Sequence, residues 1–249
     1  MKYKKIILGV ALALVCFSSL NANALTETKV KKTETQTAAP NVYWTDGYGR
    51  VSYTTNSIIS PVVKIALKEF TGDMKAVTGF DAKEKSGAPI QIYQLDQLTN
   101  KEFSAVEKLG APLHLIITAK DAFYIGTRKG KLIVIGSNAR GTAYAIMKLS
   151  ELAGVSPLAA WNDLQPAQRK SLYTPVDQQW IEVPRIEFRG LALNNSQWMK
   201  PQNYSRIARL MLRLRANTLW QVDGRHEAAY NKAVVDLSLI HISEPTRPY

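Results

Sequence analysis

Apolar positions recur with helical spacing in four stretches of the chain. The first stretch lies between Ser60-Pro61 and Gly79, which are typical start and stop signals of a helix. The second begins with Thr99 and Glu102, which have the spacing of a capping box. The helices predicted in this way cover residues 61–79, 99–109, 139–153 and 204–216.

Short runs rich in β-branched residues alternate with these helices. They predict strands over residues 89–95, 113–118, 122–126, 131–136 and 217–220. Arg128-Lys129-Gly130 separates two of the runs and predicts a hairpin. Because strands and helices alternate, the fold class is expected to be α/β, with a mixed sheet covered by helices. The stretch of about 140 residues from 42 to 183 is long enough to bury a core of its own.

The turn between the strand over 131–136 and the next helix carries unusual residues. Asn138 is a candidate N-cap, and Gly141 stands early in the helix, where a larger side chain would hold the backbone away from the strand. Such a turn could also bind a phosphate. The run from Gly136 to Gly141 matches neither GxGxxG nor GxxxxGKS/T, so tight packing is the favoured interpretation.

The region from 135 to 163 also has a distinctive order of residues. They are Gly136-Ser137, Arg140-Gly141-Thr142, Leu149-Ser150-Glu151, Gly154-Val155-Ser156-Pro157, Trp161 and Asp163. This order resembles the N-terminal domain of glycoside hydrolase family 115, the xylan α-1,2-glucuronidases. The match covers about thirty positions. The loop before Trp161 has Leu158-Ala159-Ala160 where the family has several aromatic residues.

A second block, from Pro184 to Asn194, resembles the family's entry into its catalytic (β/α)8 barrel. In the family, a Phe/Tyr-Arg-Gly strand ends in an Asn-Asp-Glu triplet. This chain has Phe188-Arg189-Gly190 and then the triplet Asn194-Asn195-Ser196. Both acidic positions of the triplet are therefore neutral here, and their roles cannot be transferred directly.

The resemblance implies an inverting, exo-acting enzyme that removes (4-O-methyl)glucuronic acid from xylan. Glycoside hydrolysis needs a carboxylic acid that protonates the leaving oxygen and a second carboxylate. The resemblance puts the general acid on later barrel strands, so the catalytic residues are unknown, and Glu187 and Asp163 are interpreted as surface or helix-end charges. The implied partner is an acidic plant polysaccharide of the glucuronoxylan type.

Five residues are expected to bind the sugar. Asn194 and Asn195 supply amides for its hydroxyl groups, and Trp198 and Trp220 supply aromatic faces. Arg140 could bind a uronate carboxylate through two hydrogen bonds. Each has a structural alternative, because the tryptophans could pack a domain interface and a helix-start arginine could bridge two domains.

The first 24 residues have the three parts of a secretory signal peptide. A basic start is followed by an apolar run from Ile6 to Leu20 and by Ala22-Asn23-Ala24, which predicts export and no stable membrane insertion after cleavage. The apolar run is shorter than a typical bilayer span. Residues 25–41 are rich in Thr and Lys and are interpreted as a linker.

Residues 237–249 read like a translated sequencing adapter. The stretch Leu237 to Arg247 back-translates to a transposase adapter sequence. We therefore expect 237–249 to be an artefact, and His241 and Glu244 are given no function. The resulting division is a signal peptide at 1–24, a linker at 25–41, an N-terminal α/β accessory domain at 42–183 and a truncated barrel start, with two βα units, at 184–236.

The cysteine and histidine content limits the metal sites and disulfides that the chain can form. Cys16, the single cysteine, lies in the predicted signal peptide, so the mature chain forms no disulfide or thiolate metal site. His114 and His226 are too far apart in sequence to suggest zinc, and no metal or cofactor is expected.

The formal charge of +12 fits an acidic polysaccharide and equally a basic surface. Arg206, Arg209 and Arg213 form a basic helix face without interleaved aromatic residues, so carboxylate pairing or solvent is expected there and nucleic acid is not. The oligomeric state stays open.

Three classes of function remain. The first is a secreted glycosidase related to the α-glucuronidases, inactive in this truncated form. The second is another barrel glycosidase with the same N-terminal domain type, such as a hexosaminidase-like enzyme. The third is a non-catalytic carbohydrate-binding or surface protein, which the neutral residues Asn195 and Ser196 favour.

Overall fold

The computed structural model describes residues 40–162, 164–193, 200–221 and 227–243. Its largest sheet has six strands in the order β3-β2-β4-β6-β5-β8. Their bounds are β2 Ser52–Thr55, β3 Lys83–Glu84, β4 Ile90–Gln94, β5 Phe123–Arg128, β6 Lys131–Gly136 and β8 Gln179–Glu182. The pairs among β3, β2, β4 and β6 are parallel, whereas β5 pairs antiparallel with β6 and β8. The predicted mixed sheet and its hairpin are therefore confirmed.

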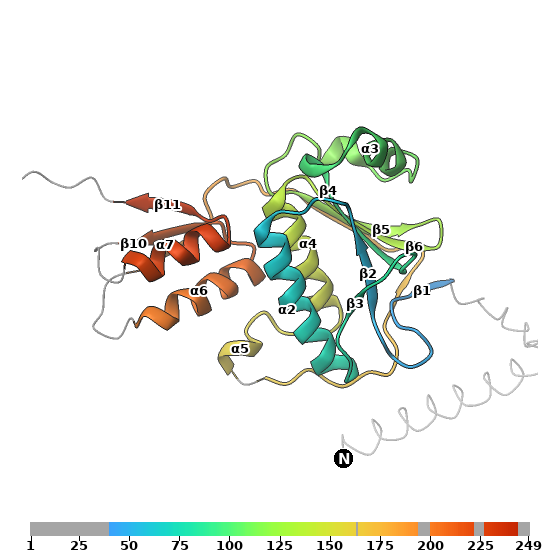
Figure 1. Cartoon of the computed structure of the whole chain (residues 1–249), viewed down its shortest axis with the longest axis horizontal. Coiled ribbons are helices and arrows are strands. Elements are labelled where there is room, and N and C mark those ends of the chain that lie inside the picture. Colours follow the sequence, from blue (N-terminus) through green and yellow to red (C-terminus); the bar gives the residue numbers. More distant parts are fainter. Residues whose placement is uncertain (1–39, 163, 194–199, 222–226, 244–249) are drawn as a thin grey trace, which may run out of the picture. The chain divides into compact units, whose positions relative to one another are not determined.

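Two long helices cover one face of this sheet (Figure 1). Helix α2 (Pro61–Thr78) ends at Gly79, whose left-handed φ of 84° lets its N–H bond to the carbonyl of Lys75. Helix α4 (Ala139–Leu152) is capped by Asn138, whose side chain accepts a hydrogen bond from the N–H of Gly141. Buried residues from both helices join β4, β5 and β6 in one hydrophobic cluster.

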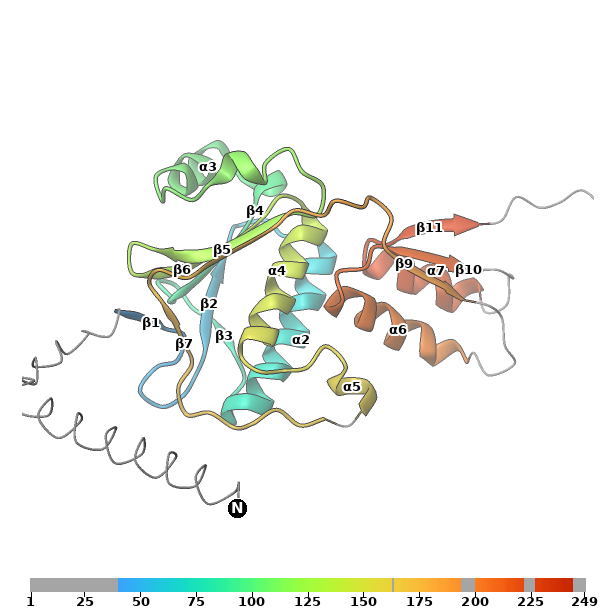
Figure 2. The same ribbon diagram turned by 180° about the vertical axis from the view of Figure 1, so that it is seen from behind.

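The other face of the sheet packs against helix α3 (Asn100–Glu107) and two 3-10 turns, Leu95–Gln97 and Leu113–Leu115. Figure 2 shows α3 on this face, on the side of the sheet away from α2 and α4. Thr99 and Glu102 form the predicted capping box at the start of α3. The predicted strand over 113–118 is wrong, because Leu113–Leu115 is a 3-10 turn and its carbonyls bond locally. His114 therefore lies in a turn and not in a strand.

A two-stranded antiparallel sheet joins the two ends of this region. Strand β1 (Asn41–Tyr43) pairs with β7 (Tyr173–Pro175), and Tyr43 lies opposite Tyr173. Strand β1 thus begins one residue before the predicted domain start. A short helix, α5 (Ala159–Asn162), precedes β7.

The third sheet is parallel and has the order β11-β10-β9. Its strands are β9 (Gly190–Leu193), β10 (Thr218–Gln221) and β11 (Ile240–Ser243), connected by α6 (Pro201–Arg213) and α7 (Glu227–Asp236). Each crossover thus contains one helix, as in the βα units of a barrel. Strand β11 lies in the segment interpreted as an adapter, and that interpretation stays a prediction.

Helices α2 and α4 lie between the six-stranded sheet and helices α6 and α7. On the side away from the six strands they contact α6 and α7, and Tyr204, Met211 and Tyr230 belong to the same hydrophobic cluster as α2 and α4. Arg213 on α6 also donates two hydrogen bonds of 2.9 Å to Asp73 on α2. The described part from residue 40 onward is therefore joined by one continuous core.

Among the described residues, no helix has the length and apolar character needed to span a bilayer. The predicted signal peptide (1–24) and residues 25–39 of the predicted linker lie outside the described residues.

Candidate functional site

The carboxyl ends of the parallel strands are the first candidate site, because βα barrels bind ligands at this edge. Trp220 stands near the carboxyl end of β10, and its side chain is 36% exposed. Strand β9 ends at Leu193. The predicted sugar-binding residues Asn194, Asn195 and Trp198 follow directly and lie outside the described residues, so their roles stay predictions.

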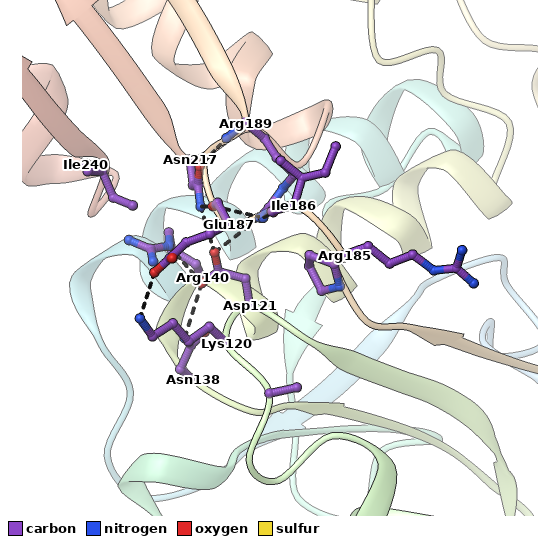
Figure 3. Close-up of a pocket in the computed structure, with 12 residues that line it drawn as sticks. Lys120, Asp121, Asn138, Arg140, Arg185, Ile186, Glu187, Arg189, Asn217 and Ile240 are labelled. Atoms are coloured by element: carbon purple, nitrogen blue, oxygen red, sulfur yellow. Dashed lines mark hydrogen bonds and ion pairs between the residues drawn. The ribbon is translucent and has the colours of Figure 1, made fainter.

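A pocket of about 540 Å³ lies at the opposite edge of the same strands. Arg189 and Asn217 line it, and each directly precedes a parallel strand, β9 or β10. Most of the other lining residues come from the segment before β5, from the start of α4 and from the segment before β9. It includes Lys120, Asp121, Asn138, Arg140, Arg185 and Glu187 (Figure 3).

Asp121 is the centre of this pocket. Its carboxylate is almost fully buried, with 2% of the side chain exposed. One oxygen accepts hydrogen bonds from Nε of Arg140 at 2.8 Å and from the amide of Asn138 at 3.2 Å. The other oxygen accepts from Arg189 at 3.1 Å and from the amide of Asn217 at 3.0 Å. Four donors from three parts of the chain thus meet on one carboxylate (Figure 3).

The strand-to-helix turn holds Asp121 in place. Asp121 has a positive φ of 60°, a conformation that Asp and Asn adopt more readily than other residues with side chains. The hydroxyl of Ser137 accepts a hydrogen bond from the N–H of Ala122 at 3.1 Å. A Cβ on Gly141 would collide with the carbonyl of Ala122, so glycine is required for this close approach.

Arg189 and Asn217 extend the network into the parallel sheet. The Arg189 guanidinium also donates to the carbonyls of Arg215 at 3.0 Å and Ile186 at 2.6 Å. Asn217 accepts a hydrogen bond from the N–H of Arg189 at 2.9 Å and donates to the carbonyl of Glu187 at 2.7 Å. The starts of β9 and β10 are therefore tied to each other and to Asp121.

The electrostatics make Asp121 a poor acid or base catalyst. Burial raises the pKa of its carboxyl, but the hydrogen bond and charge of Arg140, with the amides of Asn217 and Asn138, outweigh burial and lower the pKa below its usual range. A general acid at neutral pH needs a raised pKa. Each oxygen of the Asp121 carboxylate already accepts two hydrogen bonds. Asp121 therefore serves to join three parts of the chain, and we call this network the Asp121 junction.

Arg140 belongs to this junction. Its Nε donates to Asp121 at 2.8 Å, and its guanidinium also donates to the carbonyl of Ser238 at 2.7 Å. Arg140 thus bonds to two distant parts of the chain. Its role in sugar binding, like its alternative role as a bridge between domains, stays a prediction.

Sequence reasoning missed Asp121 and the side chain of Asn217. The sequence did indicate that a buried carboxylate was needed. Each of the two family-like motifs contains an arginine, Arg140 or Arg189, and an arginine that points into the interior needs a carboxylate partner. Which carboxylate serves them depends on the turn before β5 and could not be read from spacing.

Two of the three arginines on the basic face of α6, Arg209 and Arg213, are paired with carboxylates, as expected. Arg213 bonds to Asp73 and also lies 3.2 Å from Glu69, and Arg209 lies 3.5 Å from Glu69. The guanidinium of Arg206 lies 4.8 Å from the ring centre of Trp161. Within the described ranges, no group of three or more His, Cys, Asp or Glu side chains is arranged to hold a metal ion.

The mixed sheet with its helices and the parallel βα units form a glycosidase-like fold. One similar solved structure is a family GH115 4-O-methyl-alpha-glucuronidase with specificity for decorated arabinogalactans. The TM-score is 0.68 and the identity 25%, over 79% of this chain and 29% of that one. The chain thus spans less than a third of that protein.

Two other similar structures share the fold at lower identity. The chitobiase of Flavobacterium johnsoniae, of family GH20, has a TM-score of 0.55 and 14% identity over 82% of this chain and 32% of that one. The GH84 protein CpGH84D has a TM-score of 0.52 and 14% identity over 82% of this chain and 34% of that one. No protein-family model and no curated protein matches the sequence.

Proposed function

We propose that the chain is the N-terminal part of an exported glycoside hydrolase of the α-glucuronidase type. The observation that supports this most is the 25% identity to the GH115 glucuronidase across 79% of the chain, which includes both the accessory domain and the parallel strands. The match of Phe188-Arg189-Gly190 to the family's barrel entry agrees with it, because Arg189 ties the first parallel strand to Asp121.

The proposed reaction is the release of terminal (4-O-methyl)glucuronate from a plant polysaccharide. We infer xylan from the family resemblance, and decorated arabinogalactan is the second substrate to test because the similar glucuronidase is specific for it. The sugar would lie at the carboxyl ends of β9 and β10, with Asn194 and Asn195 on its hydroxyl groups and Trp198 and Trp220 on its apolar faces. The neutral residues Asn195 and Ser196 leave the acid and base to later strands.

Hydrolysis by these 249 residues alone is not expected. An eight-stranded barrel draws catalytic residues from the ends of several strands, and three parallel strands are described here. The test therefore uses the natural gene product with a complete barrel, incubated with glucuronoxylan and with glucuronate-decorated arabinogalactan. Glucuronate release from either polymer is the expected result.

A matched pair of tryptophan variants tests the site. Trp220→Ala should lower kcat/KM by up to about tenfold, because stacking of a sugar on an aromatic ring contributes about 0.5 to 1.5 kcal/mol. Trp161→Ala, an equally exposed tryptophan on α5, is the control and should leave kcat/KM unchanged. Equal loss in both variants would argue against a sugar platform at Trp220.

The non-catalytic alternative has one observation in its favour, the neutral pair Asn195 and Ser196. It predicts that the natural gene product binds glucuronoxylan but releases no glucuronate. That outcome would exclude the glycosidase proposal.

We also propose that residues 237–249 are adapter-derived. The presence of strand β11 is compatible with this proposal. The β-branched pattern Ile-His-Ile favours a strand, and the open edge of β10 can pair with such a segment whether or not it is native. Sequencing the gene across codon 236 decides it, and a native reading frame through Leu237 to Tyr249 would contradict the proposal.

A further inference from the structure

A cluster of aromatic and cationic side chains lies on the accessory domain, outside the parallel sheet. Three segments form it: the turn from Asp46 to Arg50, the end of α2 and the segment 168–170 before β7. Together they line a hollow of about 450 Å³ that contains Tyr48, Phe80, Arg169 and Lys170. A second hollow of about 310 Å³ shares Phe80 and is lined by Arg50.

The turn that carries Tyr48 is rigid. The carboxylate of Asp46 accepts hydrogen bonds of 2.9 Å from the N–H groups of Tyr48 and Arg50. The backbone of Asp46 and Arg50 closes the turn, with Asp46 N–H donating to the Arg50 carbonyl at 3.0 Å. Gly49 has a φ of 86°, and a Cβ there would lie 3.3 Å from the Lys170 carbonyl. The backbone that carries Tyr48 and Arg50 is thus held in one conformation by the turn itself.

The two side chains are arranged for different parts of one ligand. Tyr48 is 79% exposed, so its ring is free to cover an apolar face. The guanidinium of Arg50 lies 5.9 Å from the Tyr48 ring centre and 5.2 Å from that of Phe80. An arginine held between two rings keeps its planar edge available for a carboxylate, which it can bind through two hydrogen bonds.

The charge of the surface favours an anion. The cationic side chains of the two hollows are Arg50, Lys75, Lys83, Arg169 and Lys170, against the carboxylate of Asp81 and that of Asp46 in the turn itself. Asp81 is moreover already paired with Lys75 at 3.6 Å. The carboxyl end of α2 adds only about half a negative charge. The positive charge therefore dominates.

We infer that this surface, here named the Tyr48 site, binds the uronate residue of an acidic oligosaccharide. The C–H face of the sugar ring stacks on Tyr48, and the uronate carboxylate pairs with Arg50, with Lys170 nearby. The ligand class is the same as in the proposed function, but binding at the Tyr48 site needs no catalytic barrel. The site would hold the polymer on the accessory domain while the barrel acts elsewhere.

The experiment measures binding to the purified 249-residue chain by calorimetry. The probe is a xylo-oligosaccharide with one 4-O-methylglucuronate branch, and the neutral xylo-oligosaccharide of the same length is its partner. The acidic probe should bind at least about tenfold more tightly at low salt, and the difference should shrink in 1 M salt, where charges are screened beyond about 3 Å.

Four variants locate the binding. Arg50→Ala and Tyr48→Ala should each weaken binding of the acidic probe by about tenfold, as expected for a charge-assisted contact and a stacking contact. Tyr48→Phe keeps the ring and should bind like the parent chain. Lys108→Ala, at the end of α3, removes an exposed charge elsewhere and should change nothing. Thermal unfolding checks that each variant is folded.

Two results would overturn the inference. Binding that survives Arg50→Ala and Tyr48→Ala but is lost in Trp220→Ala belongs to the barrel edge and not to the Tyr48 site. Equal affinity for polyglutamate and for the acidic sugar indicates general charge attraction. Neither result bears on glucuronate release by the natural gene product, so failure here and failure of the proposed function are distinguishable.

Discussion

At the scale of single residues, Asp121 combines a left-handed backbone with a buried charge. Each feature alone is unfavourable, because left-handed backbone costs about 1 kcal/mol and an isolated buried carboxylate costs far more. Four hydrogen-bond donors, two of them cationic, offset both costs. The residue therefore depends on neighbours that come from α4, from the start of β9 and from the start of β10.

Asp121→Asn should lower the free energy of unfolding by about 3 kcal/mol, because it leaves the guanidinium groups of Arg140 and Arg189 without their carboxylate. Asn is chosen because it also tolerates positive φ, so the backbone is not the cause. Urea denaturation measures the change. Glu187→Gln is the control, since it breaks the exposed ion pair with Lys120 and should cost no more than about 1 kcal/mol.

The effect of Asp121→Asn should also depend on pH. The pKa of Asp121 is lowered in the folded state, so its contribution is fully present above the unfolded pKa of about 3.9 and is lost as pH falls through the lower, folded value. The difference between parent and variant should thus be smaller at pH 3 than at pH 6. A difference that grows in acid would contradict the assigned direction.

At the scale of elements, two glycines in helices have opposite reasons to be there. Gly141 in α4 lies where a Cβ would strike the carbonyl of Ala122. Gly72 in α2 is exposed, and a Cβ there would meet nothing within 4 Å. Only the first is required by packing, as its place directly after a strand-to-helix turn predicted.

Alanine substitution should separate them. Gly72→Ala should raise the free energy of unfolding by roughly 0.5 to 1 kcal/mol, the usual gain in an open helix interior. Gly141→Ala should lower it by more than about 1 kcal/mol, because the added methyl group forces the helix away from the strand. Thermal or urea unfolding of both variants gives the comparison, and stabilisation by Gly141→Ala would show that the contact is not tight.

The elements that the sequence predicted well are those fixed by local chemistry. The caps of α2, α3 and α4 and the β5 to β6 hairpin depend on neighbouring residues and could be read directly. The strand predicted over 113–118 is wrong because a 3-10 turn directs Leu113 and Ile116 towards the sheet and leaves Leu115 and Ile117 exposed. The helix predicted over 204–216 is α6, which ends at Arg213, and Leu214 directly after it is 51% exposed. The Asp121 junction needs three distant segments, which no local pattern contains.

At the scale of the whole described part, α2 and α4 are packed on both sides. The six-stranded sheet covers one side, and α6 and α7 contact the other. The bidentate pair of Arg213 with Asp73 adds a directional link, and both side chains are about 10% exposed. We therefore expect the accessory domain and the parallel units to unfold together.

A double-mutant cycle on Asp73→Ala and Arg213→Ala measures that link. The coupling energy should be about 1 to 3 kcal/mol, as for charged partners in one buried network. The exposed pair Lys232 and Asp236 on α7 serves as reference and should give about 0.5 kcal/mol or less. A coupling near zero for Asp73 and Arg213 would mean that apolar packing alone joins the two parts.

The double-sided burial of α2 and α4 also bears on how such proteins can evolve. Helices α2 and α4 supply part of the hydrophobic core that α6 and α7 need. Simple gene fusion of the mixed-sheet part to a different partner would therefore leave this side of α2 and α4 uncovered. The exposed helix faces would be apolar and the carboxylates of Glu69 and Asp73 would lose their arginines. The mixed sheet with α2 and α4 and the parallel βα units should therefore be inherited as one block, and diversity of specificity should arise in the loops.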